Sequence, residues 1–130
     1  MIVVDASVLV DVLLHIGQTD VFERRLLAAG ETAHVPHLVD IEVMQVLRRR
    51  TIAGRMAASR GHMAIDDLAA LPLLRHPHDH LLPRVWELRY NISAYDAVYV
   101  ALAEYLGAPL LTRDRRLAAA PGHRVRIDLV

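Results

Sequence analysis

The sequence predicts an α/β domain with a mainly parallel central sheet and helices on both of its faces. Short apolar runs of strand length alternate along the chain with longer stretches that have helical character. Hydrophobic residues make up 54% of the chain and aromatic residues only 5%, so the core must be aliphatic. A length of 130 residues is typical of one domain, and we expect a single domain over residues 1–130.

The first half of the chain contains two predicted strands and four predicted helices. In order they are a strand at 1–4, helices at 8–15 and 21–29, a weak strand at 33–35, and helices at 37–52 and 55–71. The opening run is apolar throughout, which is typical of a central parallel strand. Gly17, Gly30 and Gly54 follow helical stretches, where glycine commonly ends a helix. Pro36 marks the start of the helix that follows it.

The second half continues the alternation of strands and helices. The predicted elements are a short strand at 73–75, a helix at 80–90, a helix from Ser93 to Gly107, a strand at 110–111, a helical turn at 115–120 and an edge strand at 125–129. Polar and apolar residues alternate in the last segment, as they do in edge strands. Three histidines at alternate positions surround Pro77, and this spacing favours an exposed loop over a metal site. They are His76, His78 and His80.

Composition excludes several classes of site. The chain has no cysteine, which excludes disulfides, thiolate zinc sites and a cysteine nucleophile. All 15 basic residues are arginine, and a P-loop requires lysine. A net charge of zero argues neither for nor against nucleic acid as a partner. No apolar run reaches transmembrane length, so we expect a cytoplasmic protein that does not enter membranes.

Asp5 and Asp114 each follow a predicted strand directly. The carboxyl ends of parallel strands lie at one edge of a sheet, where ligands bind, so we expect both side chains there. The alternative for each is the N-cap of the helix that follows, a common position for aspartate. For Asp114, an ion pair with one of the neighbouring arginines is a further alternative, namely Arg113, Arg115 or Arg116.

Asp96 lies in the first turn of the helix that ends at Gly107. Ser93 stands three residues earlier, so the two match the Ser-x-x-Asp form of a capping box. An acid at this position also suits the helix dipole. The helix behind it is apolar on almost every face, and a carboxylate that enters a buried region needs a partner. With no lysine in the chain, that partner is an arginine, a backbone cap or a metal ion.

Glu42 is the most informative acid because it lies in the middle of a helix among apolar neighbours. Leu38 and Val46 share its face, where a solvated face would carry charge. Asp40 has Val43 on its own face, so periodicity does not separate the two acids. The sequence thus predicts a cluster of carboxylates around a divalent cation, formed by Asp5, Glu42, Asp96 and Asp114.

The remaining charged residues of the helices favour ordinary solvated positions. This group of acids comprises Glu104, Glu87, Asp66 and Asp67. The run Arg48-Arg49-Arg50 near the end of a helix suits the dipole, and it could equally contact phosphate.

With these residues identified, the chain resembles the PIN domain, specifically the VapC-type toxins of prokaryotic toxin–antitoxin pairs. The resemblance covers essentially the full length. Its marks are Ile2-Val3-Val4-Asp5-Ala6-Ser7, Glu42 in the helix after Pro36, Tyr95-Asp96-Ala97 at a helix start, and Leu111-Thr112-Arg113-Asp114 after a strand. No single mark is specific, but four in this order within a short chain are specific together.

The resemblance implies a three-layer α/β/α PIN-like domain that acts as an endoribonuclease dependent on Mg²⁺ or Mn²⁺. It assigns the metal-binding and catalytic roles to four acids, namely Asp5, Glu42, Asp96 and Asp114. Ser7 and Thr112 become supporting hydroxyls. It also implies an RNA substrate, a homodimer and a small VapB-like antitoxin that covers the site.

The implied chemistry agrees with the residues. Cleavage of a phosphodiester needs an activated water and a stabilised leaving oxygen, and Mg²⁺ with oxygen ligands can provide both. Clustered carboxylates supply those ligands and would repel one another without a cation. Two other classes stay open, namely an inactive PIN-like module that binds RNA or a partner, and another metal-dependent phosphoesterase such as a DNA nuclease or a phosphatase.

Overall fold

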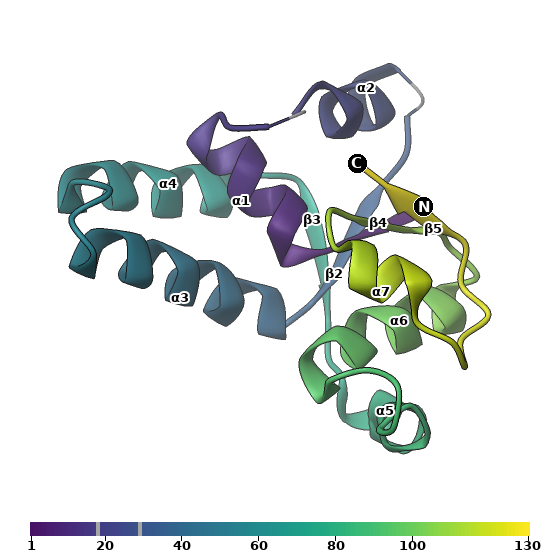
Figure 1. The fold of residues 1–130 in the computed structure, drawn as a ribbon. Coiled ribbons are helices and arrows are strands. Elements are labelled where there is room, and N and C mark those ends of the chain that lie inside the picture. The colour runs from purple at the N-terminus through teal and green to yellow at the C-terminus, as the bar shows by residue number, and fades with distance from the viewer. Residues whose placement is uncertain (18, 29) are drawn as a thin grey trace.

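A computed structural model describes residues 1–17, 19–28 and 30–130 of the chain. Its centre is a five-stranded parallel sheet with the strand order β3-β2-β1-β4-β5 (Figure 1). The strands are β1 (Ile2–Val4), β2 (Ala33–Pro36), β3 (Leu73–His76), β4 (Leu110–Thr112) and β5 (Ile127–Leu129). The predicted α/β fold with a parallel sheet is confirmed, and the C-terminal strand lies at the edge, as predicted.

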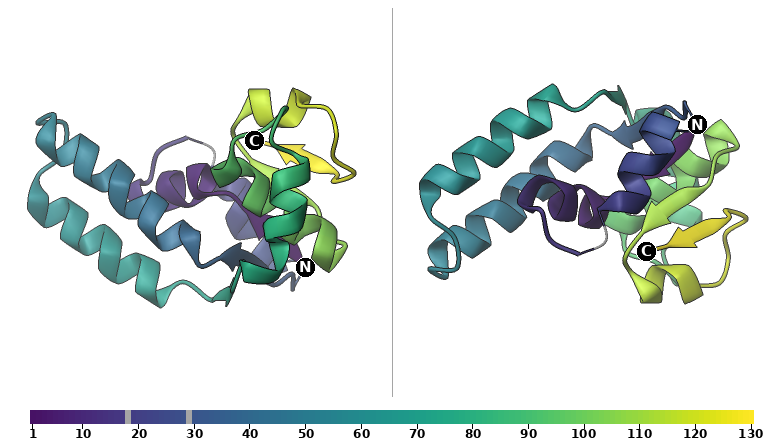
Figure 2. Two further views of the ribbon diagram at one scale, coloured as in Figure 1. Left: turned by 90° about the horizontal axis from the view of Figure 1, so that it is seen from below. Right: turned by 90° about the horizontal axis from the view of Figure 1, so that it is seen from above.

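Helices cover both faces of this sheet. They are α1 (Ala6–Leu14), α2 (Asp20–Ala28), α3 (Leu38–Ile52), α4 (Ala58–Ala70), α5 (Leu82–Glu87), α6 (Ala94–Leu106) and α7 (Arg115–Ala119), with a short 3-10 helix at Asp79–Leu81. Helices α1, α3 and α4 lie on one side, and α6, backed by α5, lies on the other (Figure 1). The α3–α4 hairpin projects from the sheet as a long arm (Figure 2).

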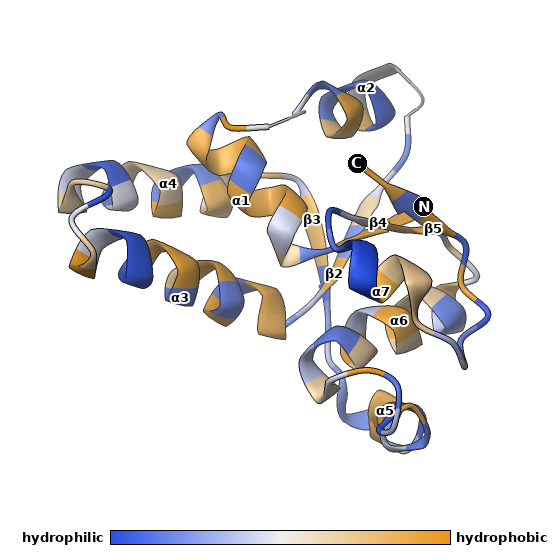
Figure 3. Ribbon diagram, viewed as in Figure 1, coloured by the Kyte–Doolittle hydropathy of each residue, from blue (hydrophilic) through white to orange (hydrophobic). Residues whose placement is uncertain are grey.

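The core is aliphatic, as the composition predicts. Strand β1 is fully buried between its neighbours, and α1 is buried on most of its circumference, because it lies against both the sheet and the α3–α4 arm. Figure 3 shows apolar residues along most of α1 and in patches on α3 and α6. Among the described residues, no helix is long and apolar enough to cross a membrane.

The order of the strands sets the place of a site. The chain first extends the sheet from β1 to β2 and β3, and then crosses back to lay β4 on the other side of β1. The direction of winding therefore reverses between β1 and β4, and open α/β sheets bind ligands beyond the carboxyl ends of such strands. Val4 pairs with Leu111, so these two strands end side by side.

Several predicted boundaries differ from the structure. The first helix begins at Ala6, two residues earlier than predicted, and the helix predicted from Arg55 begins at Ala58. The segment at 80–90 is divided, because Pro83 in the first turn of α5 starts a new helix after the 3-10 turn. The predicted helix end at Ala29 lies outside the described residues.

The prediction that His76 lies in an exposed loop is wrong. His76 ends β3, and its ring stacks on that of His34 with 5.0 Å between centroids and 2.8 Å between His76 Nε2 and His34 Nδ1. His34 Nε2 also lies 2.8 Å from Thr32 Oγ1. Burial, and then the proximity of His76, lowers the pKa of His34. The pair thus links β2 to β3 through their side chains at this edge of the sheet.

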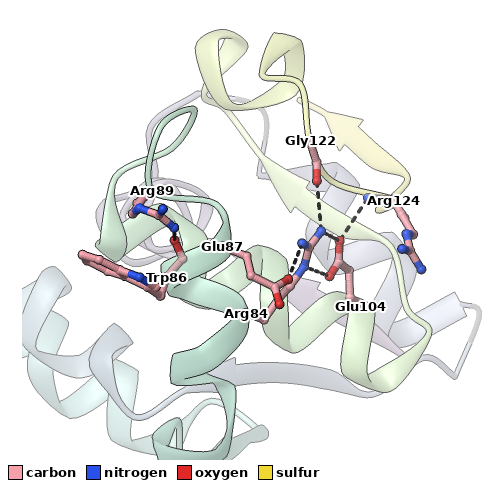
Figure 4. A network of polar contacts seen from close by, with 7 residues as sticks. All are labelled: Arg84, Trp86, Glu87, Arg89, Glu104, Gly122 and Arg124. Atoms are coloured by element: carbon pink, nitrogen blue, oxygen red, sulfur yellow. Dashed lines mark hydrogen bonds and ion pairs between the residues drawn. The ribbon is translucent and has the colours of Figure 1, made fainter.

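Glu104 was predicted to be solvated, and this is also wrong. Its two oxygens accept from Arg84 at 2.7 and 3.0 Å, and Oε1 also accepts from the backbone N–H of Arg124 at 3.0 Å (Figure 4). Arg84 donates further to Glu87 and to the carbonyl of Gly122. This network ties α5, α6 and the C-terminal loop together on the face opposite α1.

Candidate active site

Asp5 stands directly after β1 at the N-cap position of α1, yet its side chain makes no capping hydrogen bond. Instead, Oδ2 accepts from Ser7 Oγ at 2.7 Å and from Thr112 Oγ1 at 2.7 Å. The residue is only 6% exposed. The capping alternative is therefore wrong for this side chain, which is held at the edge of the sheet by two hydroxyl donors.

The same two hydroxyls fix the turn that follows β4. Thr112 Oγ1 accepts from the backbone N–H of Asp114 at 3.0 Å, and Ser7 Oγ accepts from that of Arg113 at 3.2 Å. Each hydroxyl thus donates to Asp5 and accepts from the turn between β4 and α7. The first and last predicted site segments are joined in this way, although 107 residues separate Asp5 from Thr112.

Asp114 caps a helix, as the alternative for this residue predicted. Its Oδ1 accepts from the N–H groups of Arg116 and Leu117 at 2.8 and 3.2 Å. Within the described residues, Oδ2 has no hydrogen bond and the side chain has no ion pair with a neighbouring arginine. One oxygen therefore fixes the carboxylate in place while the other stays available to a ligand.

Asp96 lies in the first turn of α6, where the Ser93 hydroxyl accepts from its backbone N–H at 3.2 Å. The predicted cap by Ser93 is thus confirmed. Burial raises the pKa of the Asp96 carboxyl, and the nearby charges of Asp5 and Asp114 raise it further, while the Ser93 hydroxyl opposes the shift. Asp96 therefore faces other carboxylates.

Glu42 and Asp40, which periodicity could not separate, point to different partners. Asp40 forms a two-pronged ion pair with Arg75 at 2.8 and 2.9 Å. Glu42 Oε2 accepts from the hydroxyl of Tyr99, a fully buried residue of α6, at 2.8 Å. Glu42 is thus the acid of α3 that turns toward α6 and the sheet.

The pKa of Glu42 is raised to about 7 from its ordinary value of 4.5. Burial is the largest cause, the Tyr99 hydrogen bond opposes it, and the charges of Asp5 and Asp96 add to the rise. The charge of Asp5 acts on both Glu42 and Asp96, and that of Asp114 acts on Asp96, so the predicted acids share one neighbourhood although they come from different elements. They are Asp5, Glu42, Asp96 and Asp114.

Across residues 1–17, 19–28 and 30–130, no three His, Asp or Glu side chains are close enough together to hold one metal ion as they stand. The carboxylates of the site are neighbours, but they remain apart. The predicted catalytic and metal-binding roles of these residues therefore stay predictions.

Two features of the site region were missed from the sequence. One is Tyr99, whose position three residues after Asp96 places it on the same side of α6. The other is Asp11, which is 3% exposed and pairs with Arg113 at 2.5 Å. A side chain at Gly17, where φ is +68°, would collide with Asp11 Oδ2. In the sequence, the sign of the Asp11–Arg113 pair was Asp11 itself, an acid within the mostly apolar helix α1.

Glu42 should titrate near pH 7 in the metal-free protein. Its folded pKa lies above its unfolded value, so the stability that protonation provides is complete below about pH 4.5 and is lost as the pH rises through about 7. Glu42→Gln has no carboxyl group to titrate at this position, so it does not lose stability in this way. The free energy of unfolding of the variant, relative to that of wild type, should therefore increase from pH 5 to pH 8. Urea unfolding with EDTA present measures it. Asp40→Asn is the control, and a constant difference between Glu42→Gln and wild type would contradict the expectation.

Thr112→Val should destabilise the protein by about 1–3 kcal/mol, because buried polar groups are left without partners. The substitution keeps the shape of a side chain that is fully buried but removes a donor to Asp5 and an acceptor for the Asp114 amide. Thr112→Ser keeps the hydroxyl and loses only a methyl group, so it should cost less. Equal denaturation midpoints for the two variants would show that the hydroxyl does not hold Asp5.

Comparison with known proteins agrees with this geometry. A family model described as the PIN domain matches residues 2–122. Ribonuclease VapC9 of Mycobacterium tuberculosis (strain H37Rv) is 48% identical over 118 residues, which cover 91% of this chain and 89% of that protein. The crystal structure of PAE2754 from Pyrobaculum aerophilum is similar with a TM-score of 0.71 at 28% identity, covering 98% of this chain and 83% of that one.

A third likeness concerns the fold alone. The crystal structure of VapBC2 from Rickettsia felis, bound to a DNA fragment from their promoter, gives a TM-score of 0.72 at 15% identity and covers 99% of this chain and 98% of that one. A family model that spans most of the chain and a relative with nearly half of its residues identical establish the family. The chain belongs to the PIN-domain family and, within it, to the VapC group.

Proposed function

We propose that this protein is an endoribonuclease that uses Mg²⁺ or Mn²⁺ to cleave RNA phosphodiester bonds, and that it is the toxin of a toxin–antitoxin pair. The observation that supports this most is the group of acids beside the carboxyl ends of β1 and β4, in a chain 48% identical to a ribonuclease over most of its length. The substrate leads us to expect action in the cytoplasm.

The donor set fits a hard divalent cation. The acidic side chains at the site offer oxygen atoms as ligands, and Mg²⁺ and Mn²⁺ favour the oxygens of carboxylates and water. Burial raises the pKa values of Glu42 and Asp96, and nearby carboxylates raise them further, so a cation between the acids would relieve that repulsion. When bound, such an ion would supply an activated water and neutralise charge on the phosphate. Binding would have to draw the side chains closer together than they stand here.

The residues of the chain prepare this site in different ways. The hydroxyls of Ser7 and Thr112 fix the orientation of Asp5. Burial raises the pKa of Glu42 to about 7, so a cation that binds there near neutral pH competes with a proton. Arg115 and Arg116 are exposed in the first turn of α7 beside Asp114, where their guanidinium groups can contact phosphate.

We also propose a small VapB-like antitoxin as a partner and a homodimer as the active form. A carboxylate cluster is complementary to guanidinium, so we expect the antitoxin to place a basic side chain, most suitably an arginine, among the acids.

Expression of the protein alone should arrest growth, and co-expression of a small protein encoded beside it should relieve the arrest. Normal growth under strong expression of soluble protein would remove the support for a toxin.

Asp96→Asn should abolish most RNA cleavage without destabilising the metal-free protein. Removing one carboxylate relieves like-charge repulsion, so the melting temperature in EDTA should equal or exceed that of wild type. The rise in melting temperature on adding Mn²⁺ should shrink, because that rise reports binding to the native state. Asp66→Asn, at an exposed position on α4, is the matched control.

Two outcomes would return Asp96 to a purely structural role. One is a lower melting temperature of Asp96→Asn in EDTA together with an unchanged metal shift, which is what weakening of its interaction with the helix dipole predicts. The other is undiminished cleavage by this variant. If wild-type protein binds RNA but cuts none, the module is a binding domain. If it cuts only DNA or phosphate monoesters, it is another phosphoesterase.

A further inference from the structure

Tyr99 is the polar side chain in an otherwise apolar stretch of α6. Residues 97–103 are all buried, and the other six are alanine, valine or leucine. Tyr99 is fully buried and is the largest side chain of the core to be so. A buried phenol hydroxyl needs a hydrogen-bond partner, whereas the ring of phenylalanine would fill nearly the same space without one. Apolar packing alone therefore does not account for a tyrosine at this position.

The hydroxyl of Tyr99 lies among the elements that form the acidic site. It donates to Glu42 Oε2 at 2.8 Å. Burial raises the pKa of Tyr99, the nearby charge of Glu42 raises it further, and the charge of Asp5 adds to the rise. A hydrogen bond from the backbone of Ala6, the residue after Asp5, opposes these effects. The hydroxyl thus reaches α3 on one side and the junction between β1 and α1 on the other.

Tyr99 brings a neutral donor to a group of acids. Asp96 precedes it by one turn of α6, so the two side chains lie on the same side of that helix. An arginine in place of Tyr99 would hold Glu42 more strongly, but it would also supply the positive charge that a cation would otherwise bring. A phenol orients the carboxylate and leaves the negative charge of the site in place.

Glu42 has a second direction in which its side chain could point. It lines a groove of about 610 Å³ on the outer side of α3, beside Arg48. Water and positive charge in that groove attract a carboxylate, while the charges of Asp5 and Asp96 repel it from the site. Within the part of the chain that the structure describes, the bond from Tyr99 is the one hydrogen bond or ion pair of the Glu42 side chain. That bond therefore opposes both effects.

We propose that Tyr99 is a positioning residue, which holds Glu42 inside the acidic site before a cation binds. This inference rests on the proposed metal-dependent function and adds the residue that prepares one of the metal ligands. Oε2 is held by the phenol, so Oε1 is the oxygen that Glu42 offers to the cation. The cation then does not have to draw this carboxylate out of the groove, and it binds more tightly as a result.

Tyr99→Phe tests the proposal because it removes the hydroxyl and keeps the buried ring. The dissociation constant for Mn²⁺, measured by calorimetry on the protein without RNA, should rise by about 10- to 100-fold, the usual effect of removing a group that orients a metal ligand. Tyr105→Phe is the matched control, because Tyr105 is 66% exposed near the end of the same helix. It should bind Mn²⁺ as wild type does. A cooperative melting transition in EDTA shows that each variant is folded.

RNA cleavage distinguishes positioning from participation in the reaction. For Tyr99→Phe, the Mn²⁺ concentration that gives half of the maximal rate should rise by the same factor as the dissociation constant. At saturating Mn²⁺, kcat and the KM for RNA should remain close to those of wild type, because the hydroxyl acts on the assembly of the site and contacts neither water nor phosphate.

A second comparison tests whether Tyr99 acts through Glu42. On the Glu42→Ala background, Tyr99→Phe should change the Mn²⁺ affinity by less than about twofold, because the carboxylate that the hydroxyl holds is gone. An equal loss of affinity on both backgrounds would show that the hydroxyl acts on another part of the site, which would overturn the inference.

Unchanged Mn²⁺ affinity in Tyr99→Phe would also overturn it. If kcat at saturating Mn²⁺ is unchanged as well, the hydroxyl serves the fold alone, and if kcat falls, the hydroxyl takes part in the reaction. Wild type is measured first with Mn²⁺ and with RNA. If it binds no cation, the proposed function fails and this inference fails with it, whereas a wild type that binds Mn²⁺ and cleaves RNA leaves the inference to be decided by Tyr99→Phe alone.

Discussion

The carboxylate of Asp5 lies at the end of the central strand, almost out of contact with water, between the hydroxyls of Ser7 and Thr112. Both donors point at the same oxygen, and both also accept from the turn after β4. A buried acid normally needs a counter-charge, but here two neutral hydroxyls hold it. Burial raises the pKa values of Glu42 and Asp96, and the nearby charge of Asp5 raises them further.

In this molecule, an acid at the start of a helix can cap that helix and still keep an oxygen available. Asp114 uses one oxygen to cap α7, so the cap fixes the carboxylate while leaving the other oxygen free within the described residues. At Asp96, the cap of the helix is Ser93, and the acid itself faces the other carboxylates. The first turn of a helix therefore orients these side chains. A capping motif in the sequence does not argue against a functional role for the acid.

The order of strands and helices was predictable because each element has a local pattern, and the acids at the ends of β1 and β4 followed from the geometry of parallel sheets. Pairings between distant residues were not predictable. Asp40 and Glu42 have different partners. Arg75, 35 residues away, forms an ion pair with Asp40, and Tyr99, 57 residues away, donates a hydrogen bond to Glu42.

The errors at His76 and Glu104 have the same origin. The partner of His76 lies 42 residues away, on the neighbouring strand, and that of Glu104 lies 20 residues away, on another helix. A local pattern shows that a residue is polar, but it does not show which other segment will pack beside it. In the sequence, Glu104 therefore has the same surroundings as any solvated helix acid.

The site draws on both ends of the chain, and this has a consequence for the protein's synthesis. β1 receives its partner β4 only after more than 100 further residues have been made, and Thr112 and Asp114 come with that strand. Because ribosomes add about 5–20 residues each second, roughly 5–20 s pass between the emergence of Asp5 and that of Asp114. During that interval the nascent chain lacks the strand that orients its first acid. A nuclease built on this plan stays incomplete until its own translation is nearly finished.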